Sequence, residues 1–182
     1  GMVPGEPDTK LSDRNLTRCL REGADMFGWS KREARPGQSR KGRWLTGMGV
    51  AAGYRAAPTM KSGARVRLTD RGQLVVATDM TDIGTGTYTI LAQTAAETMG
   101  LPLDAVRVEL GDSAFPVSAG SGGQWGAASS TAGVYAACVA LRRMIGEKLG
   151  FDADAATFDG GRAMLGGESW SIRDAGALTA ED

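Results

Sequence analysis

The feature that most constrains this sequence is a glycine turn that opens directly into a helix, in the segment TDIGTGTYTILAQTAAETMG at residues 81–100. The residues before it, 73–79, alternate as a strand, so Gly84-Thr85-Gly86 lies where a strand passes into a helix N-terminus. At such a position, unpaired backbone N–H groups and the positive end of the helix dipole point outward, and glycine lets an anion approach the backbone. The turn therefore predicts half of a phosphate-binding site.

A second loop of the same kind runs through residues 111–133 and leads into a helix that we predict over 127–149. A loop this long inside a compact domain is usually functional. Its donors, which lie just before the helix or in its first turn, are Gly120, Gly122, Gly123 and Gly126, with Ser118, Ser121 and Ser129. Either loop alone would be a common strand-to-helix connection. The two together predict a ligand with two phosphates or a polar ring system between two helix N-termini.

The remaining segments predict an α+β fold in which two long helices pack on a mixed sheet, with a further N-terminal helix. Residues 1–43 are expected to form an arm, a helix and a basic connector, and residues 44–182 a single α+β domain. The expected elements are a helix from Ser12 to Phe27 ended by Gly28, a buried strand over 44–54, a hairpin over 63–79 with one wet face on each strand, a helix over 87–99, a strand over 104–110, a small hairpin around Gly160-Gly161, and a terminal helix or frayed end over 169–182.

The composition excludes several classes of site. The 182 residues include no histidine and only two cysteines, Cys19 and Cys138, which excludes most zinc, haem and iron–sulfur sites and histidine-based triads. We interpret both cysteines as small buried hydrophobes on helix faces, with one disulfide between them left open. Lys+Arg and Asp+Glu both number 21, so the overall charge favours neither nucleic acid nor membrane as a partner. Six basic residues within 31–43 are interpreted as a solvated connector, because no aromatic platform is interleaved with them.

The printed sequence has no apolar segment typical of an export signal near residue 1 and no run of 18 apolar residues. We therefore expect a cytoplasmic location, or a periplasmic one if the chain is exported with a partner subunit.

Familiar nucleotide-binding motifs fit poorly. The segment GTGTYT lacks the third glycine of GxGxxG, and the acidic residue expected about 20 positions later would be Asp104, which opens a strand instead of closing one. No GxxxxGK[ST] motif is present, which excludes a P-loop.

Four segments carry a family resemblance: GMGVA at 47–51, DIGTGTYTILAQ at 82–93, VRVELGDS at 106–113 and SGGQWGAASSTAGVYAAC at 121–138. In order and with natural spacing, they resemble the molybdopterin-binding subunit of the xanthine dehydrogenase and aldehyde oxidase family. The closest likeness is to the bacterial aldehyde oxidoreductase branch, which uses molybdopterin cytosine dinucleotide. The resemblance extends over nearly the whole chain.

The resemblance implies that both loops contact the phosphates and pterin of this molybdenum cofactor. The implied cofactor-binding residues are Asp82, Ile83, Gly84, Thr85, Gly86 and Thr87 in the first loop, and Ser121, Gly122, Gly123, Gln124, Trp125, Gly126 and Ser129 in the second. Many relatives carry glutamine where Thr85 stands, and serine or threonine where Gln124 and Gly126 stand. A binding site formed by backbone groups would not depend on those side-chain differences. No residue of this chain is assigned a catalytic or metal-ligating role.

Family enzymes oxidise an electron-poor carbon at molybdenum with the help of a glutamate in a downstream Gly-x-Gly-Glu-like motif, and electrons leave through iron–sulfur and FAD partners. This chain matches only the middle of the second molybdenum-binding half. Gly166-Gly167-Glu168 lies in the wrong place to replace the missing glutamate, and we interpret Glu168 as a surface turn residue. The expected partners are the remaining molybdenum-subunit segments and the iron–sulfur and FAD subunits, with a homo-oligomer left open.

The sequence therefore predicts a cofactor-binding fragment of a molybdenum hydroxylase acting on aldehydes or N-heterocycles, inactive alone, that arises from cloning, a truncated gene or a split subunit. Two alternatives remain open. One is a non-catalytic assembly or interaction protein that keeps the fold without cofactor. The other is a generic nucleotide- or anion-binding module that uses the same loops.

Overall fold

The computed structural model describes residues 15–53 and 58–182. The chain divides into two compact units, residues 1–54 and 55–182, which we call unit 1 and unit 2. This division groups residues 44–53 with the N-terminal elements. Within the described ranges, no helix is long and apolar enough to cross a membrane.

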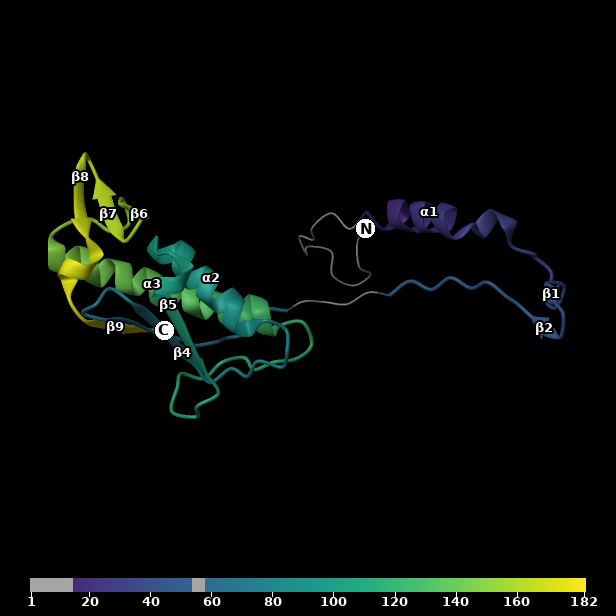
Figure 1. The fold of residues 1–182 in the computed structure, drawn as a ribbon, viewed down its shortest axis with the longest axis horizontal. Helices are drawn as coiled ribbons and strands as arrows, with labels where there is room; N and C mark the ends of the chain where they lie inside the picture. Colours follow the sequence, from purple (N-terminus) through teal and green to yellow (C-terminus); the bar gives the residue numbers. More distant parts are fainter. Residues whose placement is uncertain (1–14, 54–57) are drawn as a thin grey trace, which may run out of the picture. The chain divides into compact units, whose positions relative to one another are not determined.

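Unit 1 contains α1 (Leu16–Phe27), the short 3-10 helix η1 (Trp29–Lys31) and a small hairpin of β1 (Arg40–Lys41) and β2 (Trp44–Leu45) (Figure 1). Gly28 ends α1 in a left-handed conformation at φ 77°, which confirms the predicted helix stop. Ser12, the predicted N-cap, lies outside the described residues.

The prediction of a buried strand over 44–54 is wrong. Only Trp44 and Leu45 form a strand, and their exposed fractions are 64% and 57%. The segment pairs only with β1, and in the described part of unit 1 no second layer covers it. Cys19 is exposed for the same reason, whereas Cys138 in unit 2 is buried as predicted, and both are free thiols. Burial raises the pKa of the Cys138 thiol to about 12, although nearby Arg142 acts to lower it.

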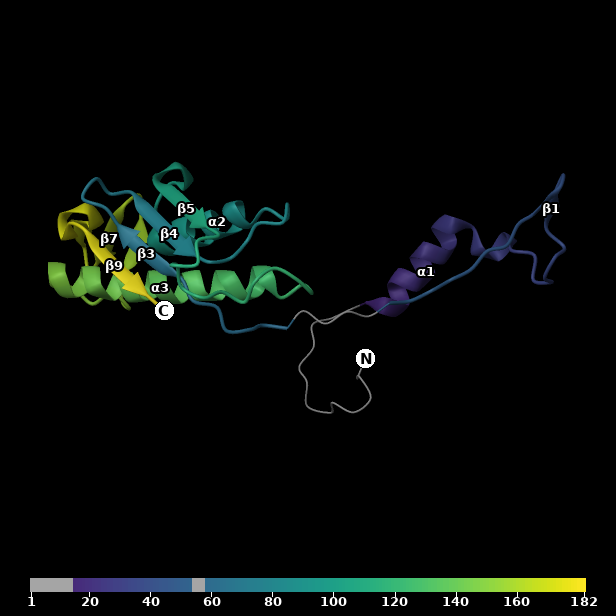
Figure 2. The same ribbon diagram turned by 90° about the horizontal axis from the view of Figure 1, so that it is seen from below.

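Unit 2 is built on a four-stranded mixed sheet with strand order β5-β4-β3-β9 (Figure 2). Its strands are β3 (Arg65–Leu68), β4 (Leu74–Thr78), β5 (Val106–Leu110) and β9 (Leu178–Glu181). β3 pairs antiparallel with β4 and β9, and β4 pairs parallel with β5. The predicted hairpin and the mixed sheet are both confirmed. β4, however, is buried along its whole length, so its predicted wet face is wrong, as expected for a strand with a parallel neighbour inside a sheet.

Two long helices, α2 (Thr87–Met99) and α3 (Gly126–Leu149), pack against each other and against this sheet. Both follow the predicted ranges, and Gly100 and Gly150 end them in left-handed conformations as predicted. The core between helices and sheet is made of small and medium apolar side chains, chiefly Val66, Leu68, Leu74, Val76, Leu91, Met99, Val134, Cys138, Leu141 and Ile145. Tyr135, predicted to face inward, is instead 56% exposed.

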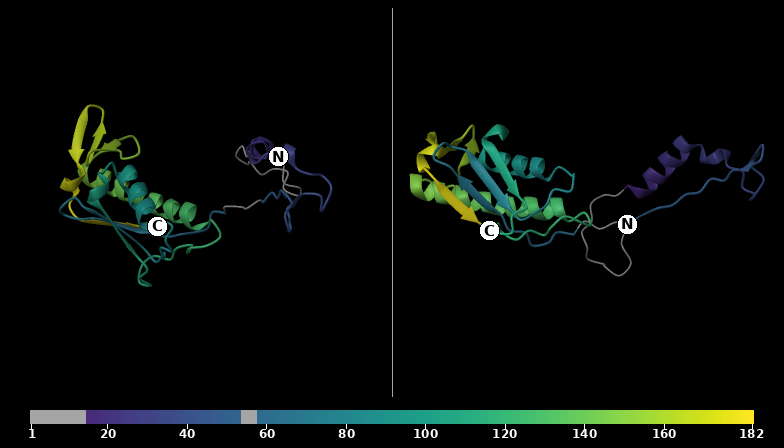
Figure 3. Two further views of the ribbon diagram at one scale, coloured as in Figure 1. Left: turned by 45° about the vertical axis from the view of Figure 1, so that its right-hand side comes forward. Right: turned by 60° about the horizontal axis from the view of Figure 1, so that its bottom comes forward.

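The last part of unit 2 differs most from expectation. A three-stranded antiparallel sheet of β6 (Thr157–Asp159), β7 (Arg162–Leu165) and β8 (Glu168–Ser171) lies at the C-terminal end of α3 (Figure 3). The 3-10 helix η3 (Ile172–Ala175) then leads into β9. The predicted terminal helix is therefore wrong, because β3 has an open edge that residues 178–181 complete by backbone pairing. Another short 3-10 helix, η2 (Leu103–Ala105), precedes β5.

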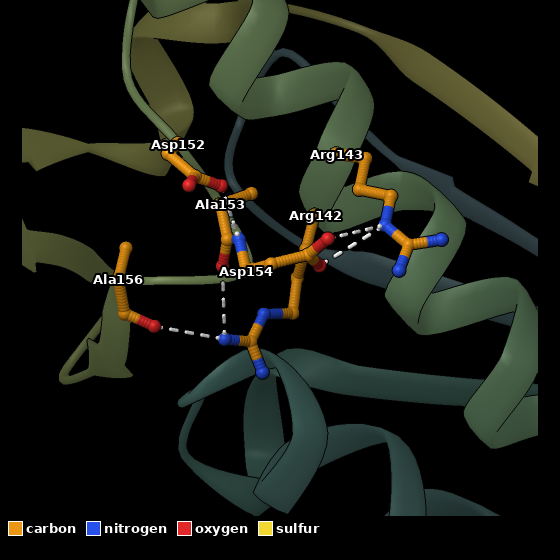
Figure 4. A network of polar contacts seen from close by, with 6 residues as sticks. All are labelled: Arg142, Arg143, Asp152, Ala153, Asp154 and Ala156. Carbon is orange, nitrogen blue, oxygen red and sulfur yellow. Dashed lines mark hydrogen bonds and ion pairs between the residues drawn. The ribbon is translucent and has the colours of Figure 1, made fainter.

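Arg142 of α3 joins three parts of unit 2 (Figure 4). Its guanidinium donates hydrogen bonds to the Thr98 carbonyl at the end of α2 and to the carbonyls of Ala153 and Ala156, at 3.4, 3.4 and 3.0 Å. Its Cζ also lies 4.0 Å from the ring centroid of Phe158 in β6. The planar fork of arginine thus donates to three carbonyls at once.

We expect Arg142→Met to lower the free energy of unfolding by about 1–3 kcal/mol, since partly buried carbonyls lose charged donors and the cation–π contact is lost. Arg143→Met is the matched control, because Arg143 forms an exposed ion pair with Asp154, 3.0 Å away, of the kind worth about 0–1 kcal/mol. Urea unfolding of both variants measures the difference. Equal losses would contradict this role of Arg142.

Candidate functional site

The two predicted loops meet because β4 and β5 are parallel neighbours. Thr78, the last residue of β4, is in register with Leu110, the last residue of β5. The chain therefore leaves both strands at the same edge of the sheet, and each strand is followed by a loop and a helix. Crevices at the carboxyl ends of parallel strands are where open α/β sheets bind ligands. Parallel pairing alone thus brings residues 79–86 close to residues 111–125.

Direct hydrogen bonds connect the two loops. The Ser121 hydroxyl donates to the Thr81 carbonyl, and the Ser118 N–H donates to Asp79 Oδ1 at 2.6 Å. The Asp79 N–H in turn donates to the Pro116 carbonyl at 3.0 Å. These bonds hold the second loop against the end of β4, so the two loops form one continuous wall.

A cleft of about 500 Å³ lies between the loops, within the usual size range of ligand pockets. Its lining is Met80, Ile83, Thr85, Thr87, Ile90, Ser121, Gly122, Gly123, Gln124, Gly126 and Ala127. Eight of these residues belong to the set implied by the family resemblance. The lining holds no charged side chain and offers hydroxyls, an amide and backbone groups. Such neutral donors and acceptors suit a polar ring system.

Five residues of the implied set do not line this cleft: Asp82, Gly84, Gly86, Trp125 and Ser129. Ser129 is fully buried, and its Oγ accepts a hydrogen bond from the Met60 N–H at 3.0 Å. It therefore anchors the chain that enters β3. Gly84 and Gly86 have φ values of 92° and 82°, and a Cβ on either would meet open space. The space beside their Cα atoms is therefore open.

Asp82 places its own carboxylate in the turn that leads into α2. Its Oδ1 accepts hydrogen bonds from the N–H groups of Gly84 and Thr85, at 2.8 and 3.1 Å. The hydrogen bond from the Gly84 N–H is the largest effect and lowers the pKa of the Asp82 carboxyl; desolvation opposes it, and the backbone N–H groups of Tyr88, Thr85 and Thr87 lower the pKa further. The negative charge that this turn was expected to attract is therefore already supplied by the chain itself.

Three lining residues were missed by the sequence reasoning: Met80, Ile90 and Ala127. Met80 follows β4 closely and is buried, with its sulfur 2.6 Å from Ser130 Oγ. Ile90 and Ala127 lie in the first turns of α2 and α3. The sequence could have indicated Ile90 and Ala127, because residues in the first turn of a helix that follows a binding loop face the same cleft as the loop.

We expect Asp82→Asn to lower the melting temperature near neutral pH, because the helix N-terminus loses its negative charge. The folded pKa of Asp82 is lowered, so its stabilisation is present above the pKa of an unfolded aspartate and is lost as pH falls from about 4 through the folded pKa. The melting-temperature difference between wild type and variant should therefore shrink on acidification.

Melting curves between neutral and strongly acidic pH provide the measurement. Asp112→Asn is the control, because Asp112 makes a similar turn with the Ala114 N–H at 2.9 Å, but away from a helix N-terminus. A wild-type-to-variant difference that stays constant with pH would show that the Asp82 charge does not matter.

Among the described residues, no group of three or more Cys, Asp or Glu side chains gathers in a way that could hold a metal. The accessible glycine backbone and the hydroxyls of the cleft nevertheless fit the organic part of a cofactor.

Comparison with known proteins defines the class. The profile of the molybdopterin cofactor-binding domain matches residues 22–180. The chain belongs to this family, and it matches a fragment-sized part of molybdenum-binding subunits of the xanthine dehydrogenase and aldehyde oxidoreductase group.

Particular relatives extend this assignment. The chain is 58% identical to the aldehyde oxidoreductase molybdenum-binding subunit PaoC of Escherichia coli K12, over 98% of this chain and 25% of that protein. It is 34% identical to the putative xanthine dehydrogenase molybdenum-binding subunit XdhA of the same organism, over 54% of this chain and 14% of that protein. The chain therefore spans about a quarter of the length of PaoC.

Solved structures show the same fold at low identity. A crystal structure of quinoline 2-oxidoreductase from Pseudomonas putida 86 matches 66% of this chain and 18% of its own, with a TM-score of 0.55 and 19% identity. A Cu,Mo-CO dehydrogenase structure matches 92% of this chain and 24% of its own, with a TM-score of 0.57 and 15% identity. The predicted α+β class and cofactor-binding-domain architecture are thereby confirmed.

Proposed function

We propose that this chain holds part of a molybdopterin cofactor, in its cytosine dinucleotide form, within a molybdenum hydroxylase that oxidises aldehydes. The observation that carries the proposal is the single cleft between two hydrogen-bonded loops, in a chain of the molybdopterin cofactor-binding family. The aldehyde substrate is supported by the 58% identity to an aldehyde oxidoreductase subunit. When bound, the cofactor would supply the molybdenum at which the substrate carbon is oxidised.

In this proposal the chain's own residues bind and orient the organic part of the cofactor. Thr85 and Ser121 offer hydroxyls to its polar ring, and Gln124 offers an amide, whereas the side chain of Thr87 is buried. Gly122 and Gly123 bring the backbone of the second loop to the wall of the cleft. Met80 and Ile90 provide the apolar surface on which a flat ring packs.

Replacing Ala127 by tryptophan tests the cleft. Ala127 and Ala128 are adjacent, exposed residues in the first turn of α3, and only Ala127 lines the cleft. After expression in a host that makes molybdenum cofactor, we expect the wild-type chain and Ala128→Trp to retain pterin, and Ala127→Trp to lose most of it, because the indole fills the space. Pterin fluorescence after oxidative release measures the bound amount.

The nucleotide released from the wild-type chain, identified by mass spectrometry, tests the cofactor form. Cytidine monophosphate supports the cytosine dinucleotide, and a different nucleotide would contradict that part. Equal pterin in Ala127→Trp and Ala128→Trp would place the ligand elsewhere. A chain that carries a plain nucleotide and no pterin would favour the generic nucleotide-binding alternative.

We also propose that unit 1 contacts the remaining segments of the molybdenum-binding subunit. Its large apolar side chains are exposed: Leu16, Leu20, Met26, Phe27, Trp44, Leu45, Met48 and Val50. Three of them, Leu20, Phe27 and Val50, line an apolar groove of about 440 Å³ between α1 and residues 49–50. A soluble protein rarely leaves so much apolar surface uncovered.

The length of the relatives favours the remaining segments of the molybdenum-binding subunit as the partner of unit 1. The CO dehydrogenase structure matches 92% of this chain, which is more than unit 2 provides, since unit 2 is 128 of 182 residues. Residues of unit 1 therefore belong to the shared fold, inside a protein about four times as long. The apolar face of α1 would then pack on parts of the subunit that this chain does not span. The iron–sulfur and FAD subunits, which are expected as electron partners, would bind elsewhere on the assembly.

We expect the purified chain to bind the dye ANS at unit 1, and the remaining molybdenum-subunit segments, supplied as a second polypeptide, to bind the chain and displace the dye. Leu20→Glu should weaken the binding of the dye and the binding of the second polypeptide, because it places a charge in the apolar groove. Arg21→Glu, on another side of the same helix, should weaken neither.

Size-exclusion chromatography with light scattering completes this test. A stable dimer of the chain that Leu20→Glu dissociates would show that a second copy, and not the rest of the subunit, covers this face. Binding of the second polypeptide that Leu20→Glu leaves unchanged would also contradict the proposal.

A further inference from the structure

Trp125 lies at the junction between the second loop and α3. It is the residue that precedes α3, and its backbone is already close to helical, at φ −91° and ψ −21°. Its indole Nε1–H donates a hydrogen bond to the Ala119 carbonyl at 3.1 Å, and its backbone N–H donates to the Gly122 carbonyl at 3.1 Å. The side chain therefore reaches back across the loop that it ends.

The indole ring lies directly against the loop backbone. A Cβ placed on Gly122 would be 2.7 Å from Cζ2 of Trp125, and one placed on Gly123 would be 1.8 Å from Cζ3. Neither distance is sterically allowed, so both residues must be glycine for the ring to lie where it does. Ring and loop thus specify each other's position.

The loop that Trp125 contacts contains an unfavourable backbone conformation. Gln124 has φ 70°, which is rare for a residue with a side chain. Gln124 is exposed and lines the cleft. Such a conformation persists only where surrounding contacts impose it, and it is most frequent at functional sites. The indole, hydrogen-bonded at Ala119, lies against Gly122 and Gly123, the two residues that precede Gln124.

Trp125 is not part of the hydrophobic core of unit 2. It is half-buried, it does not line the cleft, and its contacts given above are with residues 119–123. A tryptophan that served mainly for stability would pack into the core, as the apolar side chains of α2 and α3 do.

We propose that Trp125 is the positioning residue of the second loop, which holds Gly122, Gly123 and Gln124 in the shape that receives the ligand. This inference rests on the proposed function of the cleft. The indole acts on the ligand only through these three residues. Its removal should loosen the loop and weaken ligand binding while the fold of unit 2 remains.

Hydrogen exchange measured by mass spectrometry tests the loop without any ligand. In Trp125→Ala we expect amide exchange within residues 119–126 to accelerate by roughly tenfold, because the loop opens more often. Trp125→Phe keeps a ring but loses the N–H donor to Ala119, so it should give a smaller acceleration. Trp170→Ala is the matched control. Trp170 belongs to β8 of the three-stranded sheet, and its ring stacks on that of Phe151 with 4.6 Å between the ring centroids. It should leave exchange in residues 119–126 unchanged.

A double-mutant cycle tests the ring contact itself. Gly123→Ala should lower the melting temperature strongly in the wild-type background, because its methyl group collides with the indole. In the Trp125→Ala background only the backbone strain at φ 37° remains, so the same change should cost less. Equal costs in the two backgrounds would overturn the proposed contact.

The amount of bound pterin then tests the positioning role of Trp125 separately from the proposed function of the cleft. If the wild-type chain retains pterin, Trp125→Ala should retain less, Trp125→Phe an intermediate amount, and Trp170→Ala the wild-type amount. Unchanged pterin in Trp125→Ala would overturn the positioning role. If the wild-type chain retains none, the proposed function fails, and exchange and the double-mutant cycle still decide whether Trp125 holds the loop.

Discussion

The parallel pairing of β4 with β5 is the constraint on which the rest of unit 2 depends. Five residue pairs, from Leu74 with Val106 to Thr78 with Leu110, fix the register. Parallel strands need a long crossover, and α2 provides it. Because both strands then end at the same edge, the loops that follow them must meet, and α3 begins where the second loop ends. The cleft is a consequence of this topology before any side chain in it is specified.

Local patterns in the sequence were sufficient to predict this central arrangement. Alternation predicted the hairpin, and the glycines at positions 100 and 150 gave the ends of both helices. The glycine-rich loops indicated which residues would meet, and eight of the implied site residues line one cleft. These features are encoded within a few residues of where they act, so periodicity and turn chemistry reveal them.

The errors share a different cause. β9 forms because β3 leaves an edge open for backbone pairing. The two strands are distant in the sequence, since Arg65 of β3 and Glu181 of β9, which form an ion pair, are 116 residues apart. No local signal in residues 178–181 carries that information. The buried strand expected at 44–54 failed for a related reason, since its apolar residues indicate burial without indicating which surface buries them. The hydrogen bonds that Asp82 accepts from Gly84 and Thr85 depend on a turn geometry that a sequence cannot display, and its contact with a ligand stays a prediction.

The two loops reach a defined shape by different physical means. In the first loop, the charge of Asp82 satisfies the N–H groups of Gly84 and Thr85. In the second, a flat aromatic ring supports the backbone of Gly122 and Gly123. Neither arrangement requires a ligand, and the Ser121 hydroxyl joins the two at the Thr81 carbonyl. A site that is ordered in advance loses less conformational entropy on binding.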